Sequence, residues 1–282
     1  MIDLFVSYLK NSPFEFDLFI SVNLEEHKAL CEEKFKTLPK LKNLLVKITP
    51  NVGRDLAPFL IAFKDEFKNY DLICHIHSKK TPHDESLSGW ANYLLRNLIS
   101  KEAMGNIIVN FLKDEKIGLV FPLVYDKAFP FVLDLIDKDK ENMQALLDRM
   151  GIKCTPTKHN FIFPAGTMFW ARPTALQSLF ELGLSYGDFP KEPIGSATTI
   201  AHALERLFGI VAENSGYKIK CFVTRCDLVD SFFSNYTVQA RLREAKTRHL
   251  ELKFFGFKIA KIRQKDYAKI ARFLPLSIER LQ

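Results

Sequence analysis

The fold is indicated most clearly by one stretch, NVGRDLAPFLIAFKDEFKNYDLICHIHSKK, residues 51–80. It contains a glycine turn, a segment with helical spacing from Leu56 to Phe67, and an apolar strand from Leu72 to Ile76. Histidines and lysines follow this strand at its carboxyl end. In open α/β sheets, ligands bind in the crevice outside the carboxyl ends of the strands. The stretch therefore predicts an anion site, and a phosphate is its simplest ligand.

The rest of the chain alternates apolar runs with segments of helical spacing. Strands are predicted at 16–22, 44–48, 117–121 and 217–223, and helices at 2–10, 24–35, 89–112, 141–150, 174–182 and 199–208. Residues 161–170 are apolar but contain Pro and Gly, which favours a bent strand. This βαβα order predicts an α/β fold with a mostly parallel sheet flanked by helices.

Composition narrows the class of protein. Hydrophobic residues make up 47% of the chain and charged residues 26%, as in soluble globular proteins. No apolar run approaches the ~18 residues of a membrane span. The five cysteines are scattered and form no CxxC pair, which predicts reduced thiols in the cytoplasm and no zinc site.

The positive charge is concentrated at the carboxyl end. Residues 241–282 carry 12 Lys or Arg against 4 Asp or Glu, a surplus of 8, so the net +7 of the chain leaves −1 for the other 240 residues. Nucleic-acid binding by the main domain is therefore not expected. Residues 251–263 of this tail mix phenylalanines with lysines at close spacing, which suits an anionic membrane surface. A basic hairpin or helix that packs on the main domain is the alternative.

Asn51, Gly53, Arg54 and Asp55 form the first candidate cluster, between a strand and a helix. Asn51 and Asp55 would bind the base or ribose of a nucleotide, and Arg54 a phosphate. In the alternative, Gly53 makes the turn and Asp55 caps the helix.

The second cluster follows the strand at residues 72–76. His75 and His77 share one face of the strand, but no third metal ligand is evident nearby. Lys79 and Lys80 would neutralise a diphosphate leaving group. The alternative for the lysines is a solvated pair in a loop.

A third cluster comes from the second half of the chain. Gly166 interrupts an apolar run, where a small residue lets a ligand approach, and Trp170 is placed to line a pocket. His202, Glu205 and Arg206 share one helical face. A surface ion-pair face is the alternative for these three.

Six motifs in order, NVGRDLAPFL, YDLICHIHSKK, the tryptophan of SGW, IGLVFP, FPAGTMFWAR and AHALERLFG, resemble the rhamnan synthesis protein F family of bacterial glycosyltransferases. The similarity covers about residues 4–219. It implies a Rossmann-like GT-A fold over 1–240 that uses a nucleotide-diphosphate sugar, with a donor half at 1–125, an acceptor half at 126–240 and the tail at 241–282. The first two clusters then bind the donor, and the third binds the acceptor.

Two departures from the GT-A pattern concern the metal and the catalytic base. GT-A enzymes hold Mg²⁺ or Mn²⁺ with an Asp-x-Asp after the strand that here ends in His75 and His77, so no metal cofactor is expected. The literal Asp-x-Asp at residues 137–139 lies in a polar segment without a preceding buried strand. No acid directly precedes the helix at 199–208, which leaves Glu192 and Asp188 as the nearest candidate bases.

A third departure is at the start of the sheet. The family usually has a β-strand before the helix at 2–10, and this sequence shows none, so we expect the first strand of the sheet to be missing. The resemblance implies a cytoplasmic enzyme at the inner face of the membrane that adds a sugar, rhamnose by the family name, to a surface glycan or lipid-linked acceptor. A non-catalytic sugar-nucleotide-binding or scaffold module is the alternative.

Overall fold

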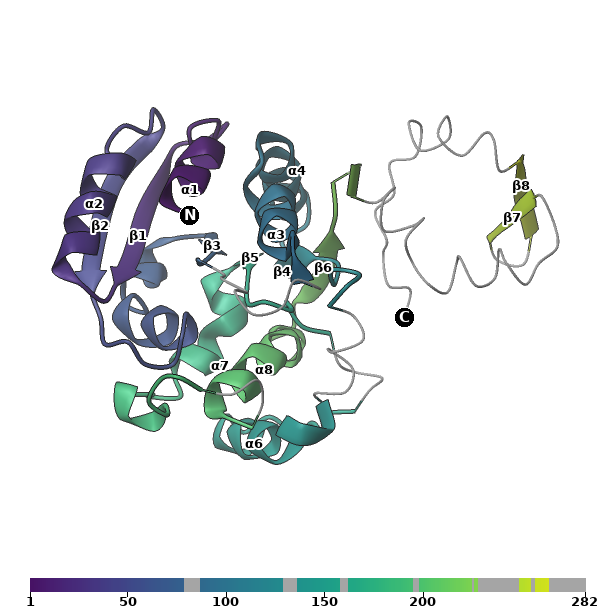
Figure 1. The fold of residues 1–282 in the computed structure, drawn as a ribbon. Helices are drawn as coiled ribbons and strands as arrows, with labels where there is room; N and C mark the ends of the chain where they lie inside the picture. Colours follow the sequence, from purple (N-terminus) through teal and green to yellow (C-terminus); the bar gives the residue numbers. More distant parts are fainter. Residues whose placement is uncertain are drawn as a thin grey trace. The chain divides into compact units, whose positions relative to one another are not determined.

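Figure 1 shows the computed structural model of the chain, which describes residues 1–78, 87–128, 136–157, 162–194, 198–224, 226–227, 249–254 and 257–263. It contains two compact units, Met1–Phe222 and Val223–Gln282. The predicted boundary at residues 240 and 241 lies outside the described residues. Among the helices described, none is both long and apolar enough to cross a membrane.

The strands of the first unit form two sheets. Their bounds are β1 (Phe16–Val22), β2 (Leu41–Ile48), β3 (Ile73–His75), β4 (Ile117–Pro122), β5 (Phe169–Ala171) and β6 (Lys218–Phe222). One sheet is the parallel pair β1–β2, and the other has the order β3-β5-β4-β6. In the second sheet, β4 and β6 are parallel, whereas β5 runs antiparallel to both β3 and β4.

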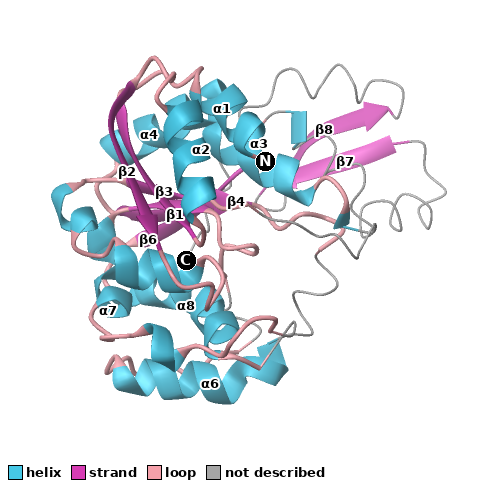
Figure 2. Ribbon diagram, turned by 60° about the vertical axis from the view of Figure 1, so that its left-hand side comes forward, coloured by secondary structure: helices cyan, strands magenta, loops and turns pink. Residues whose placement is uncertain are grey.

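Helices cover both faces of these strands (Figure 2). Their bounds are α1 (Ile2–Leu9), α2 (Glu25–Phe35), α3 (Trp90–Ile99), α4 (Lys101–Lys113), α6 (Ile136–Arg149), α7 (Gln177–Phe180) and α8 (Ile200–Asn214). Shorter helical turns are η1 (Pro58–Ala62), η2 (Glu66–Asn69), η4 (Pro173–Leu176) and η5 (Tyr186–Asp188). The helices α1 to α4 lie on one side of the strands, and α6, α7 and α8 lie on the other.

The predicted α/β class is confirmed, with three corrections. The helix expected at 56–67 is a π-helical turn, η1, followed by the 3₁₀ turn η2. The helix expected at 89–112 is split at Ser100, whose hydroxyl caps α4 by accepting from the Ala103 amide at 3.2 Å. The strand expected over 161–170 is confined to β5.

The antiparallel direction of β5 also corrects the predicted mostly parallel sheet. Just before β5, Gly166 and Thr167 adopt φ angles of +90° and +56°. These left-handed residues make a tight turn, and β5 then enters the sheet between β3 and β4. The parallel prediction is correct for the pairs β1–β2 and β4–β6.

The second unit contains a hairpin in the basic tail. There, β7 (His249–Phe254) pairs antiparallel with β8 (Phe257–Arg263). Of the two structures offered for the tail, hairpin or helix, a hairpin is present. Binding of this tail to a membrane stays a prediction.

Candidate functional site

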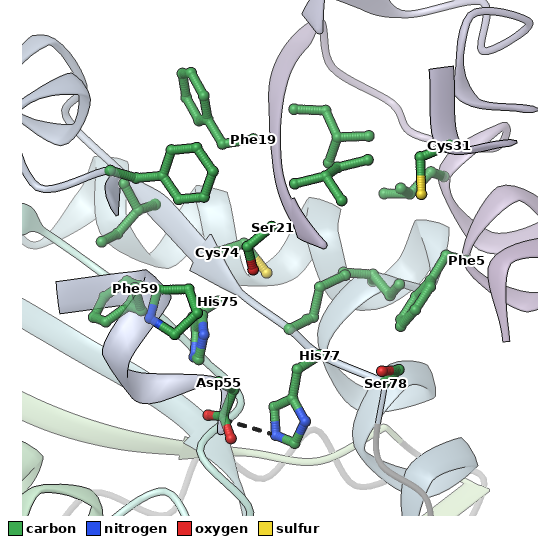
Figure 3. A pocket seen from close by; sticks show the side chains of 18 of the residues that line it. Phe5, Phe19, Ser21, Cys31, Asp55, Phe59, Cys74, His75, His77 and Ser78 are labelled. Carbon is green, nitrogen blue, oxygen red and sulfur yellow. Dashed lines mark ion pairs between the residues drawn. The ribbon is translucent and has the colours of Figure 1, made fainter. Parts of the chain in front are cut away.

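A pocket of about 1590 Å³ extends along β1 and β3 in the first unit and includes the residues that follow the carboxyl ends of β1, β2 and β3 (Figure 3). It brings together eight predicted site residues: Asn51, Arg54, Asp55, His75, His77, Trp170, His202 and Glu205. Donor and acceptor candidates from both halves of the chain thus share one pocket.

The remaining candidates are not among the described residues that line this pocket. Lys79 and Lys80 fall outside the described residues. The described residues that line the pocket do not include Gly53, Gly166, Asp188, Glu192 or Arg206.

The turn after β2 holds Arg54 in an uncommon backbone conformation. Gly53 has φ +67°, and a Cβ atom there would lie 2.6 Å from Ala57 and from Phe189. Arg54 itself has φ +53°, a left-handed conformation that costs energy for a non-glycine residue and clusters at functional sites. Gly53 therefore makes the turn, as the sequence alternative stated, and this turn directs Arg54 into the pocket.

The Arg54 guanidinium contacts both the loop at Ile194 and the first turn of α8. Nη2 donates to the Ile194 carbonyl at 3.1 Å, and Nη1 lies 3.4 Å from Nε2 of His202. The backbone amide of Arg54 donates to Oε1 of Glu192 at 3.3 Å. The turn and the segment at 192–202 are thus tied together by one residue.

Two backbone carbonyls orient the histidines at the end of β3. Nδ1 of His75 lies 2.6 Å from the Thr167 carbonyl, and Nε2 of His77 lies 2.8 Å from the Gly166 carbonyl. A carbonyl can only accept, so each of these ring nitrogens carries a proton. Nε2 of His77 also lies 3.8 Å from Oδ2 of Asp55 (Figure 3). Asp55 thus forms a carboxylate–imidazole pair with His77.

His75 is an uncharged group at neutral pH. Burial lowers the pKa of His75 to about 4, and the neighbouring Asp55 carboxylate only partly opposes this. The Phe59 and Phe169 rings lie against the imidazole, with centroid distances of 4.4 and 5.3 Å. His75 can therefore orient a ligand by hydrogen bonding, but it does not contribute positive charge.

Gly166 connects α8 to the histidines. Its amide donates to Oε1 of Glu205 at 2.7 Å, while its carbonyl accepts from His77. Glu205 and His77, which are far apart in the sequence, thus bind the two ends of the same small residue. The φ angle of +90° at this residue favours a glycine there.

The helical face of His202 and Arg206 is buried, so the surface ion-pair alternative is wrong for these residues. They are 4% and 2% exposed. Burial, together with the positive charges of Arg54 and Arg206, lowers the pKa of His202 to about 4. Oγ1 of Thr199 lies 2.7 Å from its Nδ1.

Asp139 is the residue that sequence reasoning missed. It is fully buried, accepts from the Thr198 amide at 2.6 Å, and lies 3.2 Å from Nη2 of Arg206. The spacing of Asp139 with the buried Met143 and Leu146 places it on the core face of α6, which was a usable signal. Its carboxylate therefore holds the start of α8, where His202 lies.

Both sequence candidates for the catalytic base have structural partners. Asp188 accepts from the Ser185 amide at 2.7 Å and its hydroxyl at 2.8 Å, and these hydrogen bonds hold the pKa of Asp188 below its ordinary value. Glu192 accepts from the amides of Arg54 and Ile194. Asp188 thus stabilises its own loop, and Glu192 ties its segment to the turn of Arg54.

Within the described ranges, no group of three or more His, Cys, Asp or Glu residues is placed to hold a metal ion.

Known proteins similar to this chain include WxcX, an uncharacterised protein of Xanthomonas campestris pv. campestris, in two strains. Identity is 32% over 170 residues, which cover 60% of this chain and 24% of the relative. The chain thus spans about a quarter of the length of these relatives. No solved structure matches it. The family model of rhamnan synthesis protein F matches residues 1–217, most of the first unit. The chain therefore belongs to the rhamnan synthesis protein F family.

Proposed function

We propose that this protein is a glycosyltransferase that moves a sugar from a nucleotide-diphosphate donor to a growing cell-surface polysaccharide or lipid-linked glycan. The observation that carries the proposal is the convergence of Asn51, Arg54, Asp55, His75 and His77 in one pocket near the ends of β2 and β3. Crevices at the carboxyl ends of strands are the usual ligand sites of α/β folds. The family name supports polysaccharide synthesis as the context and rhamnose as the sugar.

The proposed reaction is a substitution at the anomeric carbon of the sugar. The bond between this carbon and the diphosphate oxygen breaks, and its electron pair stays on the diphosphate. The acceptor hydroxyl oxygen forms the new bond, and its proton passes to a base on the protein. The site must therefore supply a base and positive charge for the leaving group.

His77 is our proposal for the base. It lies in the pocket, and the Gly166 carbonyl and the Asp55 carboxylate fix the orientation of its ring. A base that is itself oriented by a third group is a common arrangement for activating a hydroxyl. Glu192 and Asp188 stay candidates, but neither is among the described lining residues.

The positive charge for the leaving diphosphate is assigned to Arg54 and to the neighbouring Lys79 and Lys80. Arg54 lines the pocket, and the lysines follow His77 closely in the sequence. Because histidines and lysines stand in the sequence where GT-A enzymes carry Asp-x-Asp, donor binding is proposed to need no divalent metal.

Calorimetric titration with dTDP-rhamnose tests this assignment. Arg54→Ala and Lys79→Ala should each weaken binding about 10- to 150-fold, since a hydrogen bond to a charged group contributes roughly 1.5–3 kcal/mol. Arg149→Ala and Lys113→Ala, at exposed positions, are the matched controls. EDTA should leave the affinity unchanged. Wild-type affinity in both site variants, or a large loss on chelation, would contradict the assignment.

A non-catalytic sugar-nucleotide-binding or scaffold module is the second candidate. It is favoured by the contacts of the Arg54 guanidinium with the Ile194 carbonyl and with His202, which give this side chain a structural role. Donor hydrolysis separates the two functions. Slow release of dTDP by the wild type, lost in His77→Gln while dTDP-rhamnose still binds, supports the enzyme. Binding without any release in either protein supports the module.

We also propose that the protein works in the cytoplasm at the inner face of the membrane, where lipid-linked acceptors are found. The support is the basic, phenylalanine-rich composition of residues 241–282.

A further inference from the structure

The segment that precedes β5 packs closely against α8. A Cβ atom at Gly209 of α8 would clash with the Ile162 carbonyl, so the two backbones approach each other closely there. One helical turn earlier, Glu205 accepts a hydrogen bond from the Gly166 amide at 2.7 Å. Residues four apart share one face of a helix. These two contacts therefore hold the segment along a single face of α8.

The same segment closes into a four-residue turn. The Thr167 amide donates to the Pro164 carbonyl at 2.7 Å, and Gly166 occupies the third position of the turn with φ +90°. The carbonyls of Gly166 and Thr167 then accept from the two histidines at the end of β3. Glu205 thus holds the amide of the residue whose carbonyl orients one of these histidines.

The turn needs support from its surroundings. Thr167 has φ +56°, a conformation that is unfavourable for a β-branched side chain. Such conformations persist only where the surrounding structure fixes them. Glu205 supplies a fixed contact, because it belongs to α8, in which Leu204 and Phe208 are fully buried. We therefore expect the turn to relax when the Glu205 carboxylate is removed.

The contacts of the turn determine which ring nitrogen of each histidine can take a proton. Nε2 of His77 donates to the Gly166 carbonyl, and a neutral imidazole carries only one proton. The lone pair of His77 is therefore on Nδ1. In His75 the arrangement is reversed, because Nδ1 donates to the Thr167 carbonyl and the lone pair is on Nε2.

We propose that Glu205 is a positioning residue, which fixes the turn at 164–167 and thereby makes Nδ1 of His77 the atom that takes the acceptor proton. The inference rests on the proposed role of His77 as the base. In the transfer step, the acceptor oxygen bonds to the anomeric carbon and its proton moves to the lone pair of Nδ1. The diphosphate leaves with the electron pair of the broken bond. The Asp55 carboxylate, 3.8 Å from Nε2, stabilises the imidazolium that forms (Figure 3).

The tautomers of the two histidines test the positioning role without any substrate. Heteronuclear NMR of the imidazole nitrogens, at about pH 8.5 and so above the ordinary pKa of histidine, shows which nitrogen carries the proton. The wild type should show Nε2–H in His77 and Nδ1–H in His75, the less common form in water. In Glu205→Ala, His75 should change to a mixture of both forms. Glu205→Gln keeps an oxygen acceptor and should retain the wild-type forms, as should the control Glu213→Ala at an exposed position of α8.

Release of dTDP from dTDP-rhamnose tests the connection to the base. General-base catalysis contributes about 10²–10⁴-fold, so kcat in Glu205→Ala should fall at least about tenfold, while KM changes less than about threefold. Because Glu205 acts through His77, the double variant Glu205→Ala with His77→Gln should be no slower than His77→Gln alone. Glu205→Gln should retain kcat within about threefold of the wild type.

Three results would overturn the proposal. They are unchanged tautomers in Glu205→Ala, an additive loss in the double variant, and a loss in Glu205→Gln as large as that in Glu205→Ala. The last would show that the charge of Glu205 matters and not its hydrogen bond. If the wild type releases no dTDP, the proposed function fails together with the assignment of the proton to Nδ1. The tautomers then still decide whether Glu205 fixes the turn.

Discussion

The strands β1 and β4 are both mostly apolar, but they differ sharply in burial. All six residues of β4, IGLVFP, are buried, whereas none of the seven in β1, FDLFISV, is fully buried. β4 lies between β5 and β6, whereas among the described strands β1 pairs only with β2. Burial in this protein is therefore set by the neighbours of a strand and not by its hydrophobicity alone.

The ion pairs around α8 and around β1 also differ in burial. In the region around α8, Asp139 and Arg206 form a pair that is almost completely buried. In the region around β1, the pairs Lys34–Asp3 and Lys42–Glu15 are exposed to solvent. The four predictions below test this contrast between a closed region around β4 and α8 and an open region around β1.

The largest effect is expected for Arg206→Ala in the closed region. It leaves the Asp139 carboxylate buried without its cation, which typically costs about 3–5 kcal/mol in the free energy of unfolding. Lys218→Ala, which removes a surface pair with Asp114, is the control and should cost less than about 1 kcal/mol. Urea denaturation measures both. Similar losses in the two variants would contradict the closed-region assignment.

The second-largest loss of stability is expected when a leucine is shortened in β4, compared with the same change in β1. Leu119→Ala in β4 should lower the free energy of unfolding by about 2–5 kcal/mol, because Leu119 is fully buried. Leu18→Ala in the half-buried β1 should lower it by about 1 kcal/mol. Equal losses at both positions would remove the contrast.

Acid should lower the stability of the protein through His75 and His202 of the candidate functional site. His75 and His202 have folded-state pKa values of about 4, below the ordinary 6.5, so the unfolded chain binds more protons between these values. Their contribution is fully present above pH 6.5 and is lost as the pH falls toward 4. The free energy of unfolding, measured from pH 7 to 4.5, should fall less steeply in the double variant His75→Gln and His202→Gln. An unchanged slope would show that the two imidazoles are not buried in their neutral form.

The smallest effect on stability is expected in the tail. Deletion from Arg248 onward removes part of the second unit and should leave the unfolding midpoint of Met1–Phe222 unchanged. Sedimentation with vesicles that contain phosphatidylserine should decrease, because each basic residue near an anionic surface contributes about 1 kcal/mol. Binding of the intact protein should also weaken as salt rises. Loss of folding on truncation would refute the membrane assignment.

Local pattern predicted much of the fold, but not the breaks within its elements. The strand at 16–22 was predicted with its observed bounds, since a run of apolar residues between polar turns is a local signal. The break at Ser100 was not predicted, because the flanking helices share one continuous apolar pattern and the cap depends on a single hydroxyl. The direction of β5 was missed because it depends on two left-handed residues, one of them a threonine.

The sequence by itself determined the α/β class, the positions of most strands and the cluster after β3, because these follow from the periodicity and order of neighbouring residues. Only the tertiary structure decided which candidates meet, that Asp139 and Arg206 form a buried pair, and that β1 and β3 belong to separate sheets. Arg54 contacts His202, 148 residues away, and His77 contacts Gly166, 89 residues away. Such contacts depend on how distant segments pack, so no local pattern specifies them.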